Sequence, residues 1–168
     1  LFDSMSVLEN VMFPLDMFSN DSYKDRVKRA MFCLDHVNLS DAANKYPGEI
    51  SGGMQKRVAI ARAIALHPKY LFCDEPNSGL DPKTSLVIDE LIHSITKEFN
   101  TTTIINTHDM NSVMGIGEHI IFINQGKNEW EGTKDDVMSS ENELLNNFIF
   151  ASDLFRKVKE VELEEMRK

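Results

Sequence analysis

Two adjacent acids end an apolar run in the segment LFCDEPNSGLDP, residues 71–82. Asp74 and Glu75 directly follow YLFC, residues 70–73, whose continuous apolarity is typical of a buried strand. In α/β proteins, ligands collect at the carboxyl ends of the strands. One carboxylate there can hold Mg²⁺, usually through water, while a second orients and activates an attacking water. The alternative is a helix N-cap or an exposed turn, which acids also serve well.

A histidine stands at the end of a second apolar run. Residues 104–110 read IINTHDM, which places His108 just after a β-branched strand. If the two strands are neighbours, His108 faces the same sheet edge as Glu75 and can hydrogen-bond a phosphate oxygen or the attacking water. The remaining histidines do not stand beside acids at a predicted strand end, and a structural role is the simpler interpretation for His36, His67, His93 and His119.

A Ser-Gly-Gly turn opens directly onto a helix in SGGMQKR, residues 51–57. Gly52 and Gly53 permit a close approach of the backbone, and the free N–H groups and dipole of a helix start favour an anion. Taken alone, the segment is an ordinary capped helix. It precedes a strand ending in Asp-Glu, the turn SGLDP (78–82) and a strand ending in His, and this order favours a functional site.

Helical periodicity predicts that the segments before Asp74 and Glu75 are mainly helices. Apolar residues recur at steps of three and four from residue 6 to about residue 39. The stretch at 18–23 separates two helices, with capping candidates Ser19, Asn20 and Asp21. Residues 54–68 predict a further helix that stops before Pro68.

The period then changes to short β-branched or aromatic runs at residues 70–73, 102–106 and 119–123. Their continuous apolarity predicts strands covered on both faces, in a parallel sheet with helices between strands. Residues 126–132 predict an exposed strand or hairpin arm, and the chain is expected to be helical from Asp135 to its end.

Composition limits the class of protein. The 168 residues have the length of one domain, and 42% hydrophobic with 27% charged residues is ordinary for a soluble globular protein. The net charge of −9 argues against a nucleic-acid partner, because such binding needs Lys and Arg to replace phosphate counterions. Cys33 and Cys73 lie far apart in apolar segments and predict buried free thiols.

The chain is not expected to span a membrane, since no uninterrupted apolar stretch reaches the roughly 18 residues that a spanning helix needs. It begins at Leu1, in the middle of an apolar pattern. We therefore expect the N-terminus to be a cut in a longer protein.

The ordered segments resemble the nucleotide-binding subunit of an ATP-binding cassette (ABC) transporter. Residues 50–65 resemble its signature motif and helix, 70–76 its Walker B strand, 78–82 its D-loop and 107–109 its switch histidine. The resemblance implies an α/β fold, the RecA-like core of a P-loop NTPase, incomplete in this chain. It also implies a helical subdomain at 1–50, the signature helix with the C-terminal part of the core at 51–133, and a helical extension at 134–168.

The resemblance implies catalytic roles for the strand-end residues, with ATP as substrate and Mg²⁺ as cofactor. Asp74 would help to coordinate Mg²⁺, and Glu75 would polarise the hydrolytic water. His108 would contact the γ-phosphate. These roles agree with the chemistry expected of the residue types themselves.

The resemblance also implies a homodimer in which each subunit completes the other's site. The γ-phosphate of ATP bound to the opposite subunit would be contacted by Ser51, Gly52 and Gly53. Asp81 would link the two sites across the dimer. The usual Gln after Ser-Gly-Gly is Met54 here, with Gln55 one place later as the candidate for a nucleotide contact.

The SGGM sequence and the opening residues 1–15 are similar to the ATPases of Mce/Mla-type lipid transport systems. This implies phospholipid transport, transmembrane permease partners, an Mce-type lipid-binding protein, and a peripheral position on the cytoplasmic face of the inner membrane. The alternatives are amino-acid or metal import, lipoprotein export, or a degenerate, non-catalytic interaction module. Cassettes of DNA repair or translation are disfavoured by the acidic charge.

The phosphate-binding loop G-x-x-x-x-G-K-[ST] does not occur in these residues. Its backbone N–H groups and Lys cradle the β- and γ-phosphates, so we expect this chain alone to bind ATP poorly and to hydrolyse none. The Q-loop Gln is expected to lie before Leu1. A sheet without its early strands would expose an edge and apolar faces, which predicts self-association.

Overall fold

The computed structural model describes residues 1–149. The chain divides into two compact units, Leu1–His108 and Asp109–Lys168. The first unit contains long helices and a parallel pair of strands, and the second contains an antiparallel hairpin with short helices. The three segments predicted above, 1–50, 51–133 and 134–168, remain predictions.

The two helices predicted before residue 39 are present as α1 (Val7–Phe18) and α2 (Tyr23–His36). Helix α1 begins with a capping box: the Glu9 amide donates to Ser6 Oγ at 3.2 Å, and the Ser6 amide donates to Glu9 Oε2 at 2.7 Å. Helix α2 is capped by Ser22, one residue after the predicted candidates.

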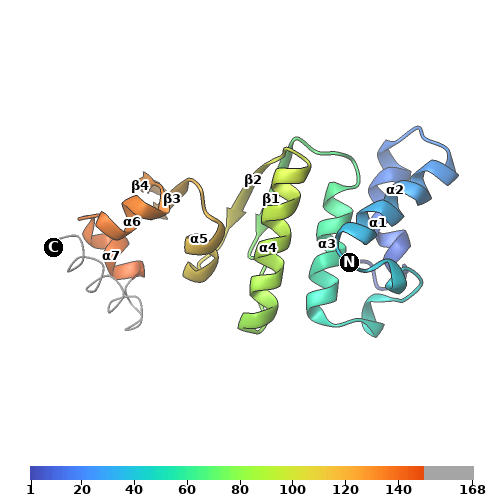
Figure 1. Cartoon of the computed structure of the whole chain (residues 1–168), viewed down its shortest axis with the longest axis horizontal. Helices are drawn as coiled ribbons and strands as arrows, with labels where there is room; N and C mark the ends of the chain where they lie inside the picture. The colour runs from blue at the N-terminus through green and yellow to red at the C-terminus, as the bar shows by residue number, and fades with distance from the viewer. Residues whose placement is uncertain (150–168) are drawn as a thin grey trace. The chain divides into compact units, whose positions relative to one another are not determined.

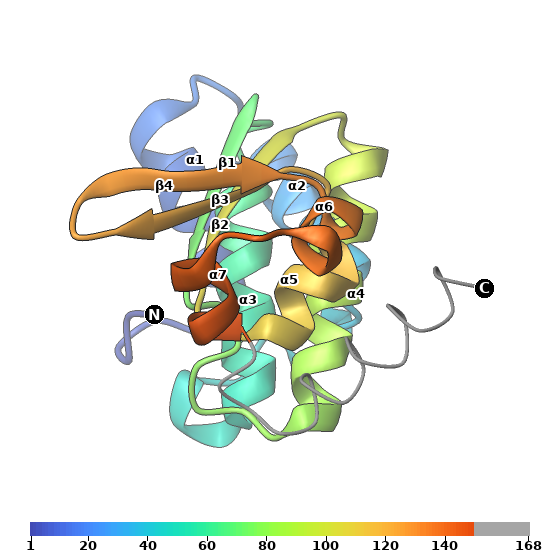
Figure 2. The ribbon, with the colours of Figure 1, turned by 90° about the vertical axis from the view of Figure 1, so that its left-hand side faces the viewer.

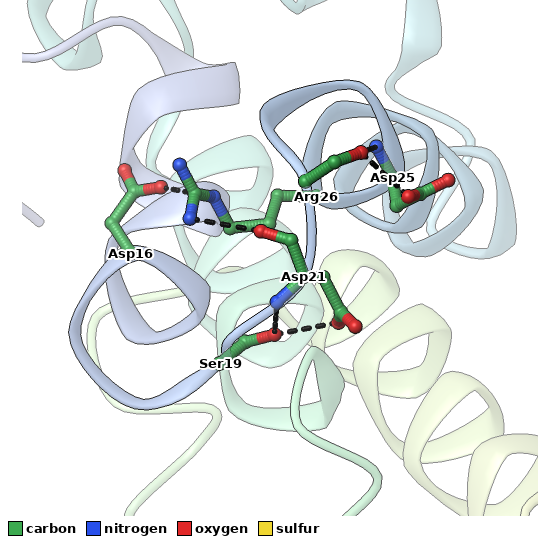
Figure 3. A network of polar contacts seen from close by, with 6 residues as sticks. Asp16, Ser19, Asp21, Asp25 and Arg26 are labelled. Carbon is green, nitrogen blue, oxygen red and sulfur yellow. Dashed lines mark hydrogen bonds and ion pairs between the residues drawn. The ribbon is translucent and has the colours of Figure 1, made fainter.

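The corner between α1 and α2 explains why the predicted caps do not act (Figure 3). Ser19 and Asp21 hydrogen-bond each other, with Ser19 Oγ 2.5 Å from Asp21 Oδ2 and the Asp21 amide 3.0 Å from Ser19 Oγ. Arg26 then ties the corner to both helices, because Nε lies 2.9 Å from Asp16 Oδ1 and Nη1 donates to the Asp21 carbonyl at 3.2 Å.

Helix α3 (Gly52–Ile64) is the centre of the first unit and packs against α1, α2 and α4 (Pro82–Glu98) (Figure 1). It ends before the predicted limit at residue 68. Arg29 of α2 donates to the carbonyls of Ile64 and Ala65, at 2.7 and 2.9 Å. It thus supplies hydrogen bonds to two carbonyl groups at the C-terminal end of α3. Two 3-10 turns, η1 (Ser40–Ala42) and η2 (Pro47–Glu49), connect α2 to α3.

The core of the first unit is formed by apolar residues on the facing sides of these helices. The fully buried members include Val7, Val11, Leu34, Val37, Val58, Ile64 and Ile88. The spacing of three and four from residue 6 to about residue 39 therefore indicated the buried faces of α1 and α2.

Strands β1 (Tyr70–Asp74) and β2 (Thr102–Asn106) pair in parallel, as predicted, with α4 as the crossover between them. Their burial alternates, because only one face packs on the core. Leu71 is 4% exposed on that face, whereas Phe72 is 71% and Ile104 50% exposed on the other. The prediction that both faces are covered is therefore wrong for the part of the chain that the structure describes.

The second unit contains α5 (Met110–Ile116), β3 (Ile120–Asn124), β4 (Lys127–Gly132), α6 (Lys134–Ser139) and α7 (Glu143–Ile149). The hairpin of β3 and β4, orange in Figure 2, turns at Gln125 and Gly126, which both have the positive φ of a type I′ turn. The predicted hairpin arm is thus confirmed. The third predicted parallel strand is wrong, since β3 pairs antiparallel with β4. The predicted helix beyond Ile149 lies outside the described residues.

Both cysteines are free, as predicted, with Cys33 buried and Cys73 half-buried. Burial raises the pKa of each thiol, and the charge of Arg29 offsets part of this effect at Cys33. Within residues 1–149, every helix is too short or too polar to cross a bilayer.

His36 joins the end of α2 to the end of α4 and predicts a pH-dependent stability. Its Nδ1 lies 2.8 Å from the Phe32 carbonyl and its Nε2 2.8 Å from Glu98 Oε1, so both nitrogens face acceptors. Burial lowers the pKa of His36, but the hydrogen bonds to Phe32 and Glu98 and the charges of Glu98 and Asp35 outweigh it and raise the pKa. The contribution of His36 to the free energy of unfolding is therefore fully present below the ordinary histidine pKa. It is lost as the pH rises through the raised pKa of the folded state.

We expect His36→Gln to destabilise the protein more at about pH 5.5 than at about pH 8.5. The difference should stay below about 1 kcal/mol, because Glu98 is 57% exposed and solvent screens the pair. Urea unfolding at the two pH values measures it. In a Glu98→Gln background the pH dependence of the His36→Gln effect should shrink, and an equal effect at both pH values would contradict this assignment.

Candidate functional site

The acids and the histidine singled out in the sequence meet at the carboxyl ends of β1 and β2. The register pairs Asp74 with Asn106, the last residues of the two strands. The Glu75 amide continues the ladder by donating to the Asn106 carbonyl at 2.8 Å. The two chain segments that leave the sheet at this edge therefore start side by side.

His108 lies against Glu75, as predicted, with Nδ1 2.7 Å from Oε1. The His108 side chain is 79% exposed and that of Glu75 33% exposed, so the pair is open to solvent. If His108 is protonated, the contact is an ion pair, and otherwise it is a hydrogen bond. The Glu75 carboxylate is thus oriented by a side chain from the segment that follows the neighbouring strand, β2.

Asp74 is exposed and is oriented by Asn106, whose Nδ2 donates to Asp74 Oδ1 at 2.7 Å. Asn106 was missed as a site residue, although its place at the end of a predicted strand was a usable signal. Within residues 1–149, groups of three or more His, Cys, Asp or Glu that could hold a metal ion are absent. Asp74 fits Mg²⁺ in the way this ion is usually held, by one or two carboxylates with water and phosphate oxygens.

Glu75 has a left-handed backbone, with φ of 45°, and its carbonyl is held from two directions. Ser78 N–H donates to it at 3.1 Å across the following turn. Lys56 Nζ, from the first turns of α3, donates to it at 3.3 Å. The backbone of this strained residue is therefore tied to the helix that begins at Ser51.

Ser51 caps α3, accepting a hydrogen bond from the Met54 amide at 3.3 Å. Gly53 lies against the start of α4: a Cβ added to it would stand 2.6 Å from Thr84 Cγ2. Gly52 has more room, with Leu80 Cδ2 at 3.8 Å from such a Cβ. The Ser-Gly-Gly turn and the turn after Glu75 are thus neighbours within one chain.

Gln55 takes part in the fold rather than standing open toward a ligand. Its Nε2 donates to the Pro47 carbonyl at 2.9 Å. The next residues of α3 act in the same way on other segments, since Lys56 reaches Glu75 and Arg57 Nη1 donates to the Val37 carbonyl at 2.9 Å. The nucleotide contact that was predicted for Gln55 remains a prediction that would require this bond to break.

Asp81 is the N-cap of α4. It accepts hydrogen bonds from the amides of Lys83 and Thr84, each at 3.1 Å, and from the Thr84 hydroxyl at 2.5 Å. The bonds from the Thr84 hydroxyl and amide are the main causes that lower the pKa of the Asp81 carboxyl. Asp81 is therefore held as a carboxylate, on the surface of the unit, at the end of the turn that starts at Glu75.

Comparison with known proteins identifies the family that this chain resembles. Residues 1–78 match the family model described as "ABC transporter". The methionine import ATP-binding protein MetN of Carboxydothermus hydrogenoformans is 42% identical over 139 residues, covering 82% of this chain and 40% of that protein. MetN of Photobacterium profundum is 40% identical over 152 residues, covering 89% of this chain and 43% of that protein. The chain thus spans about two fifths of the length of these curated relatives.

These relatives favour the amino-acid import alternative over the predicted lipid transport. The more specific resemblance to Mce/Mla-type ATPases, and the Mce-type partner inferred from it, are not supported by them. The prediction rested on Met54 and the opening residues, which are few positions compared with the length of the match.

Among solved structures, the dimeric, post-hydrolysis state of the ATP-binding cassette MJ0796 bound to ADP and Pi is similar to this chain. The identity is 38% and the TM-score 0.69, over 80% of this chain and 59% of that one. Over the part of the cassette that it spans, this chain therefore has the fold of an ABC ATPase, and its sequence is similar to the ATP-binding subunits of ABC transporters.

Proposed function

We propose that this chain is part of the ATP-binding subunit of an ABC transporter that couples ATP hydrolysis to the import of an amino acid, methionine being the first candidate. The observation that carries the catalytic part is the Glu75–His108 contact of 2.7 Å beside Asp74, at the strand ends of an ABC ATPase fold. The similarity to methionine import proteins supports the cargo.

In this proposal, Glu75 polarises the attacking water and His108 contacts the γ-phosphate. The 2.7 Å bond between them orients the carboxylate before substrate arrives, which removes one source of disorder from the reacting groups. Asp74, oriented by Asn106, would hold Mg²⁺ through water, and the ion would offset the charge of the phosphates.

The proposal includes a homodimer in which the ATP site of one subunit is completed by Ser51, Gly52 and Gly53 of the other subunit. The start of α3 offers backbone N–H groups and the positive end of the helix dipole to an anion. Asp81, held on the surface by Thr84, would link the two sites across that dimer. The MJ0796 cassette, which is dimeric in its solved structure, supports this assembly.

The transmembrane permease is the other proposed partner, which places the subunit peripherally at the cytoplasmic face of the membrane. Since the ATPase does not touch the cargo, the substrate is tested on the whole transporter. In cells lacking the gene for the full-length protein, we expect uptake of labelled methionine to fall. Restoring the wild-type gene should restore uptake, and a gene carrying Glu75→Gln should not.

Two further results would change this proposal. If phospholipid distribution changes while methionine uptake does not, the cargo is lipid and the ATPase assignment stands. If neither changes and the purified full-length protein releases no phosphate from ATP, the chain belongs to a non-catalytic interaction module.

A further inference from the structure

The turn that runs from Glu75 to Asp81 is anchored by one buried polar side chain. Asn77 is 8% exposed, whereas its neighbours Ser78 and Gly79 are exposed. Asn77 Nδ2 donates to Asp89 Oδ1 at 2.8 Å, and Asp89 is itself 5% exposed. The turn after the catalytic acid is thus tied to the buried face of α4, twelve residues further along the chain.

A buried amide–carboxylate pair at this place carries an energetic cost. Asp89 lies on the core-facing side of α4, in the row that contains Ile88, Ile92 and Ile95. A carboxylate buried there is costly unless it is hydrogen-bonded, and an apolar residue would fill the same space without that cost. The pair therefore favours one conformation of the turn, the one in which Asn77 Nδ2 reaches the Asp89 carboxylate.

That conformation sets both ends of the turn. Leu80 N–H donates to the Asn77 carbonyl at 3.1 Å, and Ser78 N–H donates to the Glu75 carbonyl at 3.1 Å. Glu75 has φ of 45° and Gly79 has φ of 79°, so the turn needs two left-handed residues, one of which is not glycine. A buried anchor between them limits the backbone conformations open to so short a segment.

We propose that Asn77, through its bond to Asp89, is a positioning residue that fixes Glu75 for hydrolysis and Asp81 for contact with the partner subunit. The pair acts directly on the turn, through the buried bond between Asn77 and Asp89. Its catalytic meaning rests on the proposed function, while its effect on the turn does not.

The two residues can be exchanged, which provides a sharp test in the full-length protein. Asn77→Asp places two carboxylates face to face, and neither can donate to the other unless one is protonated. Asn77→Asp combined with Asp89→Asn restores an amide and a carboxylate in reversed order. Glu90→Gln is the matched control, because it removes an acid from the adjacent, exposed position of α4.

The first readout is hydrogen exchange of the Ser78 and Leu80 amides, measured relative to the Ile92 amide in α4. Losing a buried hydrogen bond should speed exchange of the turn amides roughly tenfold in Asn77→Asp. The second readout is ATP turnover, where kcat should fall by a similar factor and KM should stay within about twofold, as for a group that acts on the transition state. The double variant should regain both, and Glu90→Gln should change neither.

Unchanged exchange in Asn77→Asp, or a double variant that remains as defective as the single one, would overturn the proposal. If Asn77→Asp does not fold, the double variant decides: folding with wild-type exchange supports the pair, and failure to fold contradicts it. If the wild-type protein hydrolyses no ATP, the proposed function fails, while the exchange pattern still decides whether the pair holds the turn.

Discussion

Glu75→Gln in the full-length protein is expected to lower ATP turnover by at least about 100-fold, the usual effect of removing a positioned proton acceptor. The substitution keeps the shape of the side chain and leaves an oxygen that can still contact His108. It removes the negative charge and the basicity with which Glu75 would polarise water. ATP binding should therefore persist, and the protein should accumulate as an ATP-bound closed dimer.

Phosphate release measures the turnover, and light scattering with and without ATP measures the dimer. Glu90→Gln, an exposed acid of α4, is the control for loss of one negative charge and should keep wild-type turnover. Wild-type turnover in Glu75→Gln would remove Glu75 from its role. Loss of ATP binding together with turnover would instead indicate that the carboxylate is needed to form the site.

Gly53→Ala is expected to destabilise the protein by about 1–3 kcal/mol, the usual cost of forcing an extra carbon into a filled space. The new Cβ would stand 2.6 Å from Thr84 Cγ2, closer than such atoms approach in proteins. Thr84 cannot rotate its methyl group away cheaply, because the rotation would break the bond from its hydroxyl to the Asp81 carboxylate. The clash must therefore move the start of α3 away from the start of α4, and ATP turnover should fall as well.

Thr84→Ser provides the matched background for this prediction. Serine keeps the hydroxyl that bonds Asp81 and lacks the methyl group that Gly53→Ala would strike. In this background the added methyl has room, and alanine restricts the unfolded chain more than glycine does, which stabilises the protein by about 0.4–1 kcal/mol. Urea unfolding should show Gly53→Ala as destabilising beside Thr84 and neutral or stabilising beside Ser at that position. Equal losses in both backgrounds would show that the contact is not the cause.

The elements of the first unit could be predicted well because their signals are local. The spacing of Val7, Val11 and Leu34 indicates which helix faces are buried, and YLFC indicates a strand. The meeting of Glu75 and His108 also followed from the sequence, since polar residues at the carboxyl ends of neighbouring parallel strands share one sheet edge.

The pairing of the strands was predicted less well, because the sequence of an apolar strand does not indicate which other strand it pairs with. The runs of β2 and β3 are alike in composition, yet β2 pairs in parallel with β1 and β3 turns back on β4. Nor could the sequence show that Phe72 and Ile104 are exposed, since a continuous apolar strand reads the same whether or not a second layer covers it.

The sequence by itself determined the helical and strand segments, the acids and histidine of the candidate site, and the ABC type of fold, because each depends on local pattern or on ordered motifs. Only the tertiary structure decided the contacts that orient them: Asn106 on Asp74, Lys56 on the Glu75 carbonyl, Asn77 on Asp89, and Thr84 against Gly53. Each joins residues of different elements through one or two atoms. Such contacts depend on strand register and helix packing. Neither can be predicted from a short stretch of sequence.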